Sequence, residues 1–145
     1  MKISTCMTRQ VQVADPEQSL HQAAKMMDEL DAGSIPVGEN DRLVGMITDR
    51  DIVIRAVALG KGPDTSIREV MSPDVMYCYD DEEVEDVLEN MGDLRVRRLP
   101  VLNRDKRLVG IVSLGDLARN GETMEAGQAL SGISQPGGEH SQTAH

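Results

Sequence analysis

The sequence predicts an α+β protein made of two tandem repeats, each in the order β-α-β-β-α. Three observations support this prediction. Ser34–Val37 (SIPV) returns as Arg98–Val101 (RLPV) about 64 residues later, Leu43–Thr48 (LVGMIT) returns as Leu108–Ser113 (LVGIVS), and apolar residues upstream keep the same register. Each repeat is too small to bury a good core alone, so we expect the two to pack about a pseudo-twofold axis that leaves two equivalent clefts.

The first repeat, residues 1–62, is expected to begin with a helical lead-in at Ile3–Met7 and a short strand at Val11–Val13. A helix should follow, because Asp15 is a good N-cap, Pro16 suits the first helical position and Gln18 completes a capping box. The core-facing stripe of this helix is formed by Leu20, Ala23, Ala24 and Met27.

Gly33 is expected to end this helix. Two strands should follow at Ile35–Val37 and Leu43–Ile47, joined by the turn-rich segment 38–41, and a last helix should open at Thr48.

The second repeat, residues 63–120, predicts the same elements in the same order. Its lead-in lies at Ile67–Met71 and its first strand at Val75–Tyr79. Asp80 should cap the helix, with Glu83 closing the box and Gly92 ending it. The remaining strands are expected at Leu99–Leu102 and Leu108–Val112, followed by a helix from Ser113.

Residues 121–145 lose this periodicity, and their last part is rich in Ser, Gly and Gln. Such a composition cannot build a core, so the sequence predicts a flexible C-terminal tail, with Leu130 and Ile133 available to dock on a neighbour.

Composition excludes several classes of function. Of the 145 residues 39% are hydrophobic and 28% charged, as in a globular protein, but only 1% are aromatic. A formal charge of −10 and the lack of rings for base stacking argue against a nucleic-acid partner. No apolar run reaches spanning length and no signal-like start is present, so we expect a cytoplasmic protein without a membrane partner.

The sequence gives no signal for a metal site. Cys6 and Cys78 are not repeat equivalents, and the three histidines lie far from any CxxC or HxxH partner. Two reduced, partly buried thiols are the simpler interpretation, with a redox switch or metal site as the alternative. Neither a nucleophile–base pair nor a Walker-type loop is present, so no catalytic residue is assigned.

The strongest local motif is a glycine, two apolar residues, a hydroxyl, two spacers and an aspartate, at the junction of a strand and a helix. It occurs as Gly45 to Asp51 and as Gly110 to Asp116. Free N–H groups and the hydroxyl could hold a phosphate, and the aspartate could accept hydrogen bonds from a ribose. Thr48 with Asp51, and Ser113 with Asp116, equally have the spacing of a capping box, and both roles can coexist.

A second motif places Arg97 and Arg98 at the entry of the Leu99–Val101 strand. Guanidinium groups bind phosphate oxygens in bidentate fashion, although surface pairing with acids such as Asp93 is an alternative. The first repeat has Gly33 and Ser34 at these positions, so the two clefts should differ in phosphate affinity. For Arg55 and Arg119, helix salt pairs with the nearby aspartates are the simpler interpretation.

Taken together, the duplicated order, the entries Cys6-Met7-Thr8 and Val70-Met71-Ser72, the two Pro-containing strands and the paired Gly-h-h-Thr/Ser-x-x-Asp elements resemble a pair of CBS (cystathionine-β-synthase) domains, a Bateman module. The resemblance covers Ile3 to about Arg119. In detail, the sequence is similar to small stand-alone bacterial members of the family.

This resemblance implies a CBS-type fold and a regulatory module that binds an adenosine ligand in the inter-repeat clefts: AMP, ADP, ATP or sometimes S-adenosylmethionine. It implies that the phosphate and ribose are contacted by Thr48, Asp51, Ser113 and Asp116. It implies further phosphate contacts from Arg97 and Arg98. The adenine would be contacted by Val11, Ile35, Pro36 and Val75.

We therefore expect a non-enzymatic nucleotide sensor without a resident cofactor, which forms a homodimer and acts on a separate protein partner. Ligand would shift the populations of two arrangements of the repeats or of the dimer. A ligand-free dimeric interaction scaffold that presents an acidic surface is the alternative.

Overall fold

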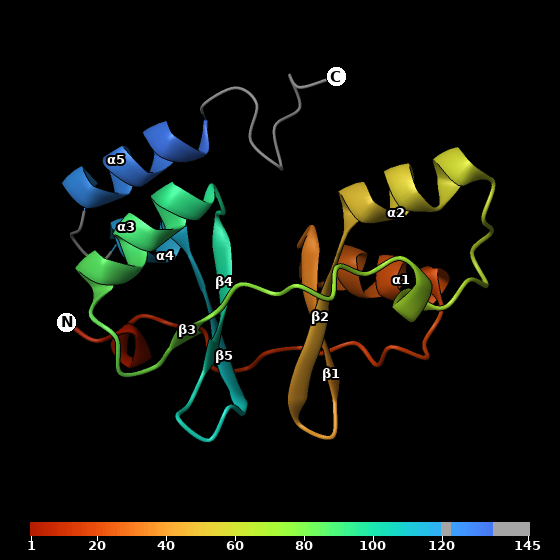
Figure 1. The fold of residues 1–145 in the computed structure, drawn as a ribbon, viewed down its shortest axis with the longest axis horizontal. Coiled ribbons are helices and arrows are strands. Elements are labelled where there is room, and N and C mark those ends of the chain that lie inside the picture. Colours follow the sequence, from red (N-terminus) through yellow and green to blue (C-terminus); the bar gives the residue numbers. More distant parts are fainter. Residues whose placement is uncertain (120–122, 135–145) are drawn as a thin grey trace. The chain divides into compact units, whose positions relative to one another are not determined.

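A computed structural model describes residues 1–119 and 123–134 of the chain (Figure 1). Its elements are η1 (Ile3–Thr5), α1 (Leu20–Leu30), β1 (Ser34–Glu39), β2 (Arg42–Thr48), α2 (Asp49–Arg55), η2 (Val57–Leu59), η3 (Ile67–Glu69), β3 (Cys78–Tyr79), α3 (Val84–Leu94), β4 (Arg98–Leu102), β5 (Leu108–Ser113), α4 (Leu114–Arg119) and α5 (Thr123–Ile133). No helix among the described residues is both long and apolar enough to cross a bilayer.

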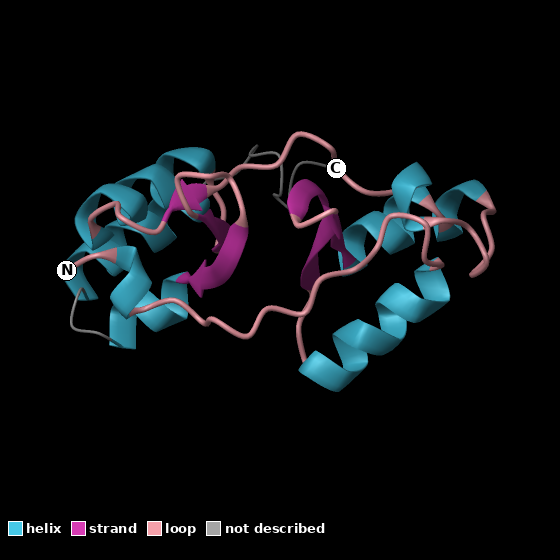
Figure 2. Ribbon diagram, turned by 90° about the horizontal axis from the view of Figure 1, so that it is seen from below, coloured by secondary structure: helices cyan, strands magenta, loops and turns pink. Residues whose placement is uncertain are grey.

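The chain divides into two compact units that do not coincide with the two sequence repeats. The middle unit comprises residues 12–75, and the terminal unit combines residues 1–11 with the chain from Met76 onward. The middle unit therefore contains the lead-in of the second repeat, and the terminal unit contains the lead-in of the first. In each unit a β-hairpin is backed by helices (Figure 2).

The two hairpins follow the repeat closely. β1 pairs antiparallel with β2 and β4 with β5, each with a register shift at the same repeat position, after Val37 and after Val101. Asn40 and Asp41 have φ values of 54° and 62°, as a two-residue type I′ turn requires. The longer second loop is held by Asn103 Oδ1, which accepts hydrogen bonds from two backbone N–H groups.

Backbone hydrogen bonds attach each lead-in to its unit. In the middle unit Met46 and Ser72 exchange N–H···O bonds of 3.0 and 2.9 Å, and in the terminal unit Thr8 and Ile111 exchange bonds of 2.8 and 2.9 Å. Arg68 adds ion pairs to Glu17 at 2.7 Å and to Glu39 at 2.9 Å, although such exposed pairs contribute little.

A glycine allows this close approach in each unit. A Cβ atom on Gly45 would lie 2.6 Å from Met71 Sδ, and one on Gly110 would lie 2.6 Å from Met7 Sδ. The glycine that opens each strand–helix motif is therefore required because the lead-in backbone and its methionine lie directly against the strand.

Each lead-in also supplies apolar side chains to the core of its unit. The middle core contains Ala14, Leu20, Ala23, Met27, Ile35, Val37, Ile47, Ala56, Ile67, Val70 and Met71. The terminal core contains Ile3, Met7, Cys78, Val84, Val87, Leu88, Met91, Leu99, Val101, Val112, Leu117, Ala126 and Ala129.

The expected helix boundaries are wrong in both repeats. α1 begins at Leu20 with Ser19 as N-cap and a capping box to Gln22, while Asp15 belongs to a preceding turn in which its N–H donates to Gln18. α3 begins after Glu83, which makes no side-chain cap. Each of these acid-rich or Ser-rich segments contains several residues that could cap a helix, a few positions apart. The packing of the lead-in determines which of them is the N-cap.

The expected glycine stops are also wrong. The C-cap residues are Asp31 after α1 and Arg95 after α3, both in the left-handed region with φ of 51° and 59°, and Gly92 lies inside α3. The first strands are shorter than expected: Val11–Val13 forms none, with one bridge from Ala14 to Val37, and Val75–Tyr79 shrinks to the two residues of β3.

The expectation of a flexible tail at 121–145 is wrong for its first part, because Thr123–Ile133 forms α5. This helix packs closely on α3. A Cβ atom on Gly92 would lie 3.1 Å from Ala129 Cα, and one on Gly132 would lie 2.7 Å from the Gly92 carbonyl oxygen. The sequence of α5 has weak helix propensity, so this packing is what stabilises the helix. Residues 121, 122 and 135–145 lie outside the described residues.

The exchange of lead-ins makes a direct prediction. Ile67→Ala should destabilise the middle unit, and Ile3→Ala the terminal unit, by about 2–5 kcal/mol each, because both side chains are fully buried. Hydrogen exchange read by mass spectrometry should show lost protection at 20–48 for Ile67→Ala and at 84–117 for Ile3→Ala. The exposed Val57→Ala is the control. Loss of protection within the mutated repeat instead would contradict the exchange of lead-ins between the two repeats.

Candidate functional site

The two hydroxyl–aspartate pairs lie where β2 passes into α2 and where β5 passes into α4. The Asp51 N–H donates to Thr48 Oγ1 at 3.0 Å while Thr48 N–H donates to Asp51 Oδ2 at 3.1 Å. In the second repeat Ser113 and Asp116 make the same reciprocal bonds, both at 3.1 Å. The capping interpretation is thereby confirmed for both pairs.

The aspartate of each box also has an arginine partner in the helix that it caps. Only Oδ2 takes part in the boxes, and the Asp51 and Asp116 side chains are 14% and 20% exposed. Asp116 Oδ1 accepts from Arg119 Nη2 at 2.5 Å, and Arg55 Nε lies 3.9 Å from Asp51 Oδ1, so the predicted helix salt pairs are confirmed. A carboxylate oxygen has two lone pairs and can accept from more than one donor.

The hairpins place the preceding strand entry beside each box. Arg98 is the cross-strand partner of Ser113, and Leu114 N–H donates to the Arg97 carbonyl at 2.8 Å. The structure therefore brings together the predicted residues Arg97, Arg98, Ser113 and Asp116 in the terminal unit. Both arginines are exposed, and within residues 1–119 and 123–134 neither makes an ion pair, with Asp93 or any other acid.

The middle unit has the same backbone and different charges. Ser34 is the partner of Thr48, and Asp49 N–H donates to the Gly33 carbonyl at 2.9 Å. The Asp49 carboxylate lies against Gly33, where a Cβ would be 2.9 Å from Oδ2. Sequence reasoning did not single out Asp49, whose counterpart is the apolar Leu114. The terminal box thus has two arginines at its strand entry, and the middle box has none.

The predicted apolar contacts divide between the units. Val11 belongs to the terminal unit, while Ile35, Pro36 and Val75 belong to the middle unit. Val11 and Val75 are half-buried at matched positions, each following a matched turn. Ile35 is 1% exposed within the middle core, so its side chain serves packing, and Pro36, the next residue along β1, has the opposite orientation but is buried as well.

The two cysteines lie in different surroundings. Burial raises the pKa of Cys78 to about 12, so this thiol stays protonated at neutral pH. Cys6 is half-buried with its Sγ 3.1 Å from Met1 Sδ. Among the residues that the structure describes, no group of three or more His, Cys, Asp or Glu side chains could hold a metal ion.

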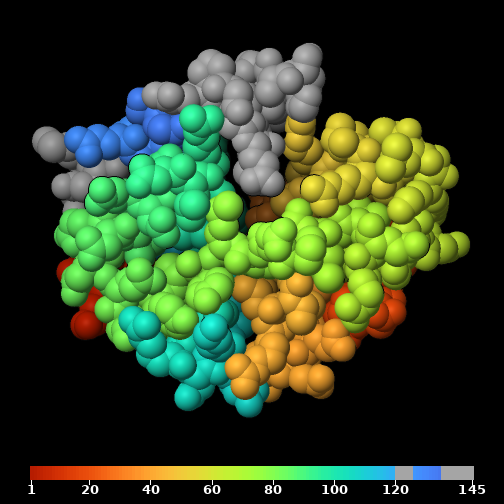
Figure 3. All heavy atoms as spheres, in the orientation of Figure 1, coloured from red at the N-terminus to blue at the C-terminus, as the bar shows by residue number. Residues whose placement is uncertain are grey.

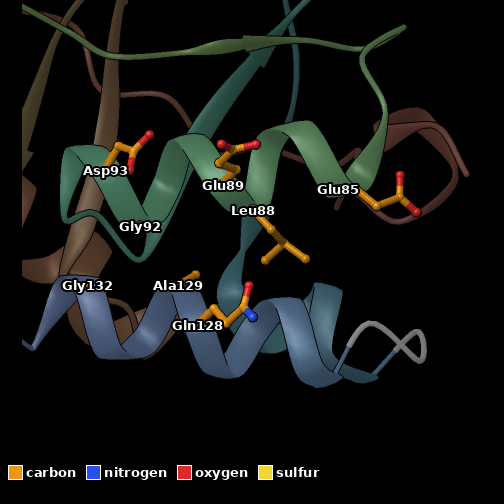
Figure 4. Close-up of a pocket in the computed structure, with 8 residues that line it drawn as sticks. All are labelled: Glu85, Leu88, Glu89, Gly92, Asp93, Gln128, Ala129 and Gly132. Carbon is orange, nitrogen blue, oxygen red and sulfur yellow. The ribbon is translucent and has the colours of Figure 1, made fainter.

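A cavity of about 480 Å³ opens between α3 and α5 (Figure 4), and its lining includes no residue of either box. Its floor is formed by Leu88, Gly92, Ala129 and Gly132, and its walls carry the carboxylates of Glu85, Glu89 and Asp93. These negative charges would repel a phosphate, so the cavity is unsuited to a nucleotide.

Comparison with known proteins gives a consistent result. The profile of the CBS domain family matches residues 3–57 and 67–122. The CBS domain-containing protein YhcV of Bacillus subtilis is 41% identical over 133 residues, 91% of this chain and 94% of YhcV. Hypoxic response protein 1 of Mycobacterium tuberculosis is 42% identical over 105 residues, 71% of this chain and 73% of that protein.

Solved structures agree. The crystal structure of Hypoxic Response Protein I with two coordinated zinc ions has a TM-score of 0.75 at 37% identity, covering 82% of this chain and 98% of that one. The CBS domain pair of MJ0100, in complex with 5′-methylthioadenosine and S-adenosyl-L-methionine, has a TM-score of 0.73 at 28% identity, covering 83% of this chain and 94% of the other.

The closed boxes predict a stability effect that is separate from any ligand. Thr48→Ala and Ser113→Ala should each lower the free energy of unfolding by about 1 kcal/mol, because each removes the acceptor for a helix N–H. Urea denaturation of the ligand-free protein measures this change. The exposed Ser131→Ala on α5 should change it by less than about 0.5 kcal/mol. Equal stability in all three variants would contradict a capping role.

Proposed function

The chain belongs to the CBS domain family and carries two CBS domains, and we propose that it is a regulatory module that binds an adenosine nucleotide. The observation that carries this proposal is the group of Arg97, Arg98, Ser113 and Asp116 in the terminal unit. Two exposed guanidinium groups, with no acidic partner among the residues that the structure describes, stand beside a hydroxyl–carboxylate pair. An anionic group and a sugar are the ligand parts that such a set can bind.

Each residue has a distinct role in the proposal. Arg98, and Arg97 beside it, bind phosphate oxygens through charge-assisted hydrogen bonds. Asp116 accepts from the ribose hydroxyls through Oδ1, while its Oδ2 stays in the capping box. Ser113 positions the carboxylate and contributes its hydroxyl. Val11, half-buried in the same unit, offers an apolar surface for the adenine ring.

The middle unit suits a different adenosine ligand. Thr48 and Asp51 can hold a ribose in the same way, and Pro36 and Val75 can contact adenine, with Ile35 behind them in the core. Ser34 offers no charge for phosphate, and Asp49 would repel it. This site therefore favours ligands with few or no phosphates. A related CBS pair, that of MJ0100, binds 5′-methylthioadenosine and S-adenosyl-L-methionine, neither of which carries a phosphate.

The proposed output is regulatory, without catalysis. Ligand would stabilise one arrangement of the protein over another by the difference in its affinity for the two, and a separate protein partner would read the change. Homodimerisation remains a prediction. If no ligand binds in the first experiment below, the result would favour a ligand-free scaffold.

Thermal unfolding tests the ligand directly. The melting temperature should rise saturably with AMP, ADP, ATP or S-adenosylmethionine, because a ligand that binds only the folded state at 100 times its Kd stabilises it by about 2.7 kcal/mol. In Asp51→Asn/Asp116→Asn the shift should largely disappear, while the amide oxygen still accepts in each box. Asp93→Asn is the exposed control on α3. No shift with any of these ligands would overturn nucleotide binding.

The arginine difference predicts unequal sites. Arg98→Ala should weaken ATP binding about 10- to 100-fold, since a hydrogen bond to a charged group contributes about 1.5–3 kcal/mol, and should leave adenosine binding unchanged. Ser34→Arg should strengthen ATP binding by creating the missing cation in the middle unit. Isothermal titration measures both, with Lys61→Ala as a control of equal charge. Equal loss of ATP and adenosine affinity in Arg98→Ala would refute the phosphate role.

A further inference from the structure

In the middle unit the carboxylate of Asp49 fills the space beside the strand entry at Gly33. A Cβ atom on Gly33 would lie 2.9 Å from Asp49 Oδ2, 3.2 Å from its Cγ and 3.3 Å from its Oδ1, so the whole carboxylate lies against this glycine. The segments that carry the two residues, orange for the hairpin and yellow for α2, reach the surface of the unit in Figure 3, and Asp49 is exposed. A side chain at position 33 would displace the carboxylate, so glycine is what allows this contact.

The internal repeat reverses the charge at this place. Gly33 and Asp49 correspond to Arg97 and Leu114 in the terminal unit. The backbone bond between the two positions is the same in both repeats, with Asp49 N–H donating to the Gly33 carbonyl at 2.9 Å and Leu114 N–H to the Arg97 carbonyl at 2.8 Å. One strand entry therefore carries a carboxylate on this backbone pair, and the other carries a guanidinium group.

The negative charge of Asp49 has no ion-pair partner within the part of the chain that the structure describes. Its Oδ1 accepts a hydrogen bond from the Arg50 N–H at 2.8 Å, while Arg55 on the same helix approaches Asp51. The capping box also uses Asp51 rather than Asp49. A carboxylate in the first turn favours the helix dipole, but that effect does not require contact with Gly33. The position of the Asp49 carboxylate is therefore explained neither by capping nor by ion pairing.

The proposed function, on which this inference rests, gives the charge a position relative to the ligand. In it Asp51 accepts from the ribose, and the strand entry faces the group on the 5′ carbon, as Arg98 does in the terminal unit. Ser34, the equivalent of Arg98, is the cross-strand partner of Thr48, and Asp49 follows Thr48 directly. A carboxylate at this place attracts a positively charged 5′ group and repels a phosphate.

We propose that Gly33 and Asp49 form a specificity pair that makes the middle site selective for adenosine derivatives with a positively charged 5′ group, a sulfonium or an ammonium. Asp49 supplies the charge, and Gly33 provides the space that holds the carboxylate at the strand entry. Arg97 and Leu114, at the same places in the terminal unit, select the opposite charge. The two repeats of one chain thereby distinguish a cationic from an anionic adenosine ligand.

Isothermal titration with S-adenosylmethionine and S-adenosylhomocysteine tests the proposal, because these compounds differ only in the methyl group that gives the sulfur its positive charge. The full chain carries Asp116→Asn, so that the middle site is measured alone. This protein should bind S-adenosylmethionine about 5- to 10-fold more tightly, the effect of one attractive charge pair near the protein surface. Adding Asp49→Asn should make the two affinities equal. Asp28→Asn, which removes the same charge from an exposed residue of α1, should keep the preference.

A second variant tests the position of the carboxylate without removing it. Gly33→Ala leaves the charge of the chain unchanged, but its Cβ atom forces Asp49 Oδ2 away, so most of the preference should be lost. Gly62→Ala is the matched control, because a Cβ atom there meets nothing within 4 Å.

The outcomes separate this inference from the proposed function. Equal binding of the two compounds by the Asp116→Asn protein would overturn the charge selection and still support an adenosine site. A preference that survives both Asp49→Asn and Gly33→Ala would overturn the role of the pair. If neither compound binds, the proposed function of the middle unit fails, and this inference fails with it.

Discussion

The structure depends on the attachment of each lead-in to the hairpin of the other repeat. Ile3 and Ile67 are fully buried, and the bridges of Thr8 to Ile111 and of Ser72 to Met46 carry the lead-in backbone across a glycine. Without this exchange each hairpin would expose one side of its core. The arrangement also ties the two repeats to each other through the chain itself, so neither sequence repeat contains all of the residues that its own core requires.

The same attachment stabilises the junction at which the candidate site lies. The lead-in packs against the strand that ends in Thr48 or Ser113. The next helix begins at that residue, and the hydrogen bonds of its capping box have the lengths of a regular cap. Each box uses one carboxylate oxygen, Oδ2, and the other oxygen of each aspartate faces an arginine of the same helix. The hydroxyl–aspartate pair is thus held rigidly by its structural role, which is the condition for precise recognition of a sugar.

The two repeats keep one backbone and differ in what surrounds it. Arg97 and Arg98 stand where the first repeat has Gly33 and Ser34, and the terminal unit has an additional helix, α5, packed on α3 and α4. The first difference separates the proposed ligands by their phosphate charge. Duplication supplied two equivalent scaffolds, and side-chain changes at a few positions give each its own role in the functions proposed for them.

The sequence by itself determined the duplication, both hairpins, the strand–helix junctions and the membership of the CBS domain family, because these follow from local alternation, turn residues and short motifs. The register of the second hairpin, seen in the structure, makes Arg98 and Ser113 cross-strand partners. Only the tertiary structure decided which hairpin each lead-in joins, where α1 and α3 begin, and that Thr123–Ile133 is a helix. Residues far away along the chain determine which of several possible caps is used. They also stabilise a helix that contains glycine. The local sequence pattern carries no information about those distant residues.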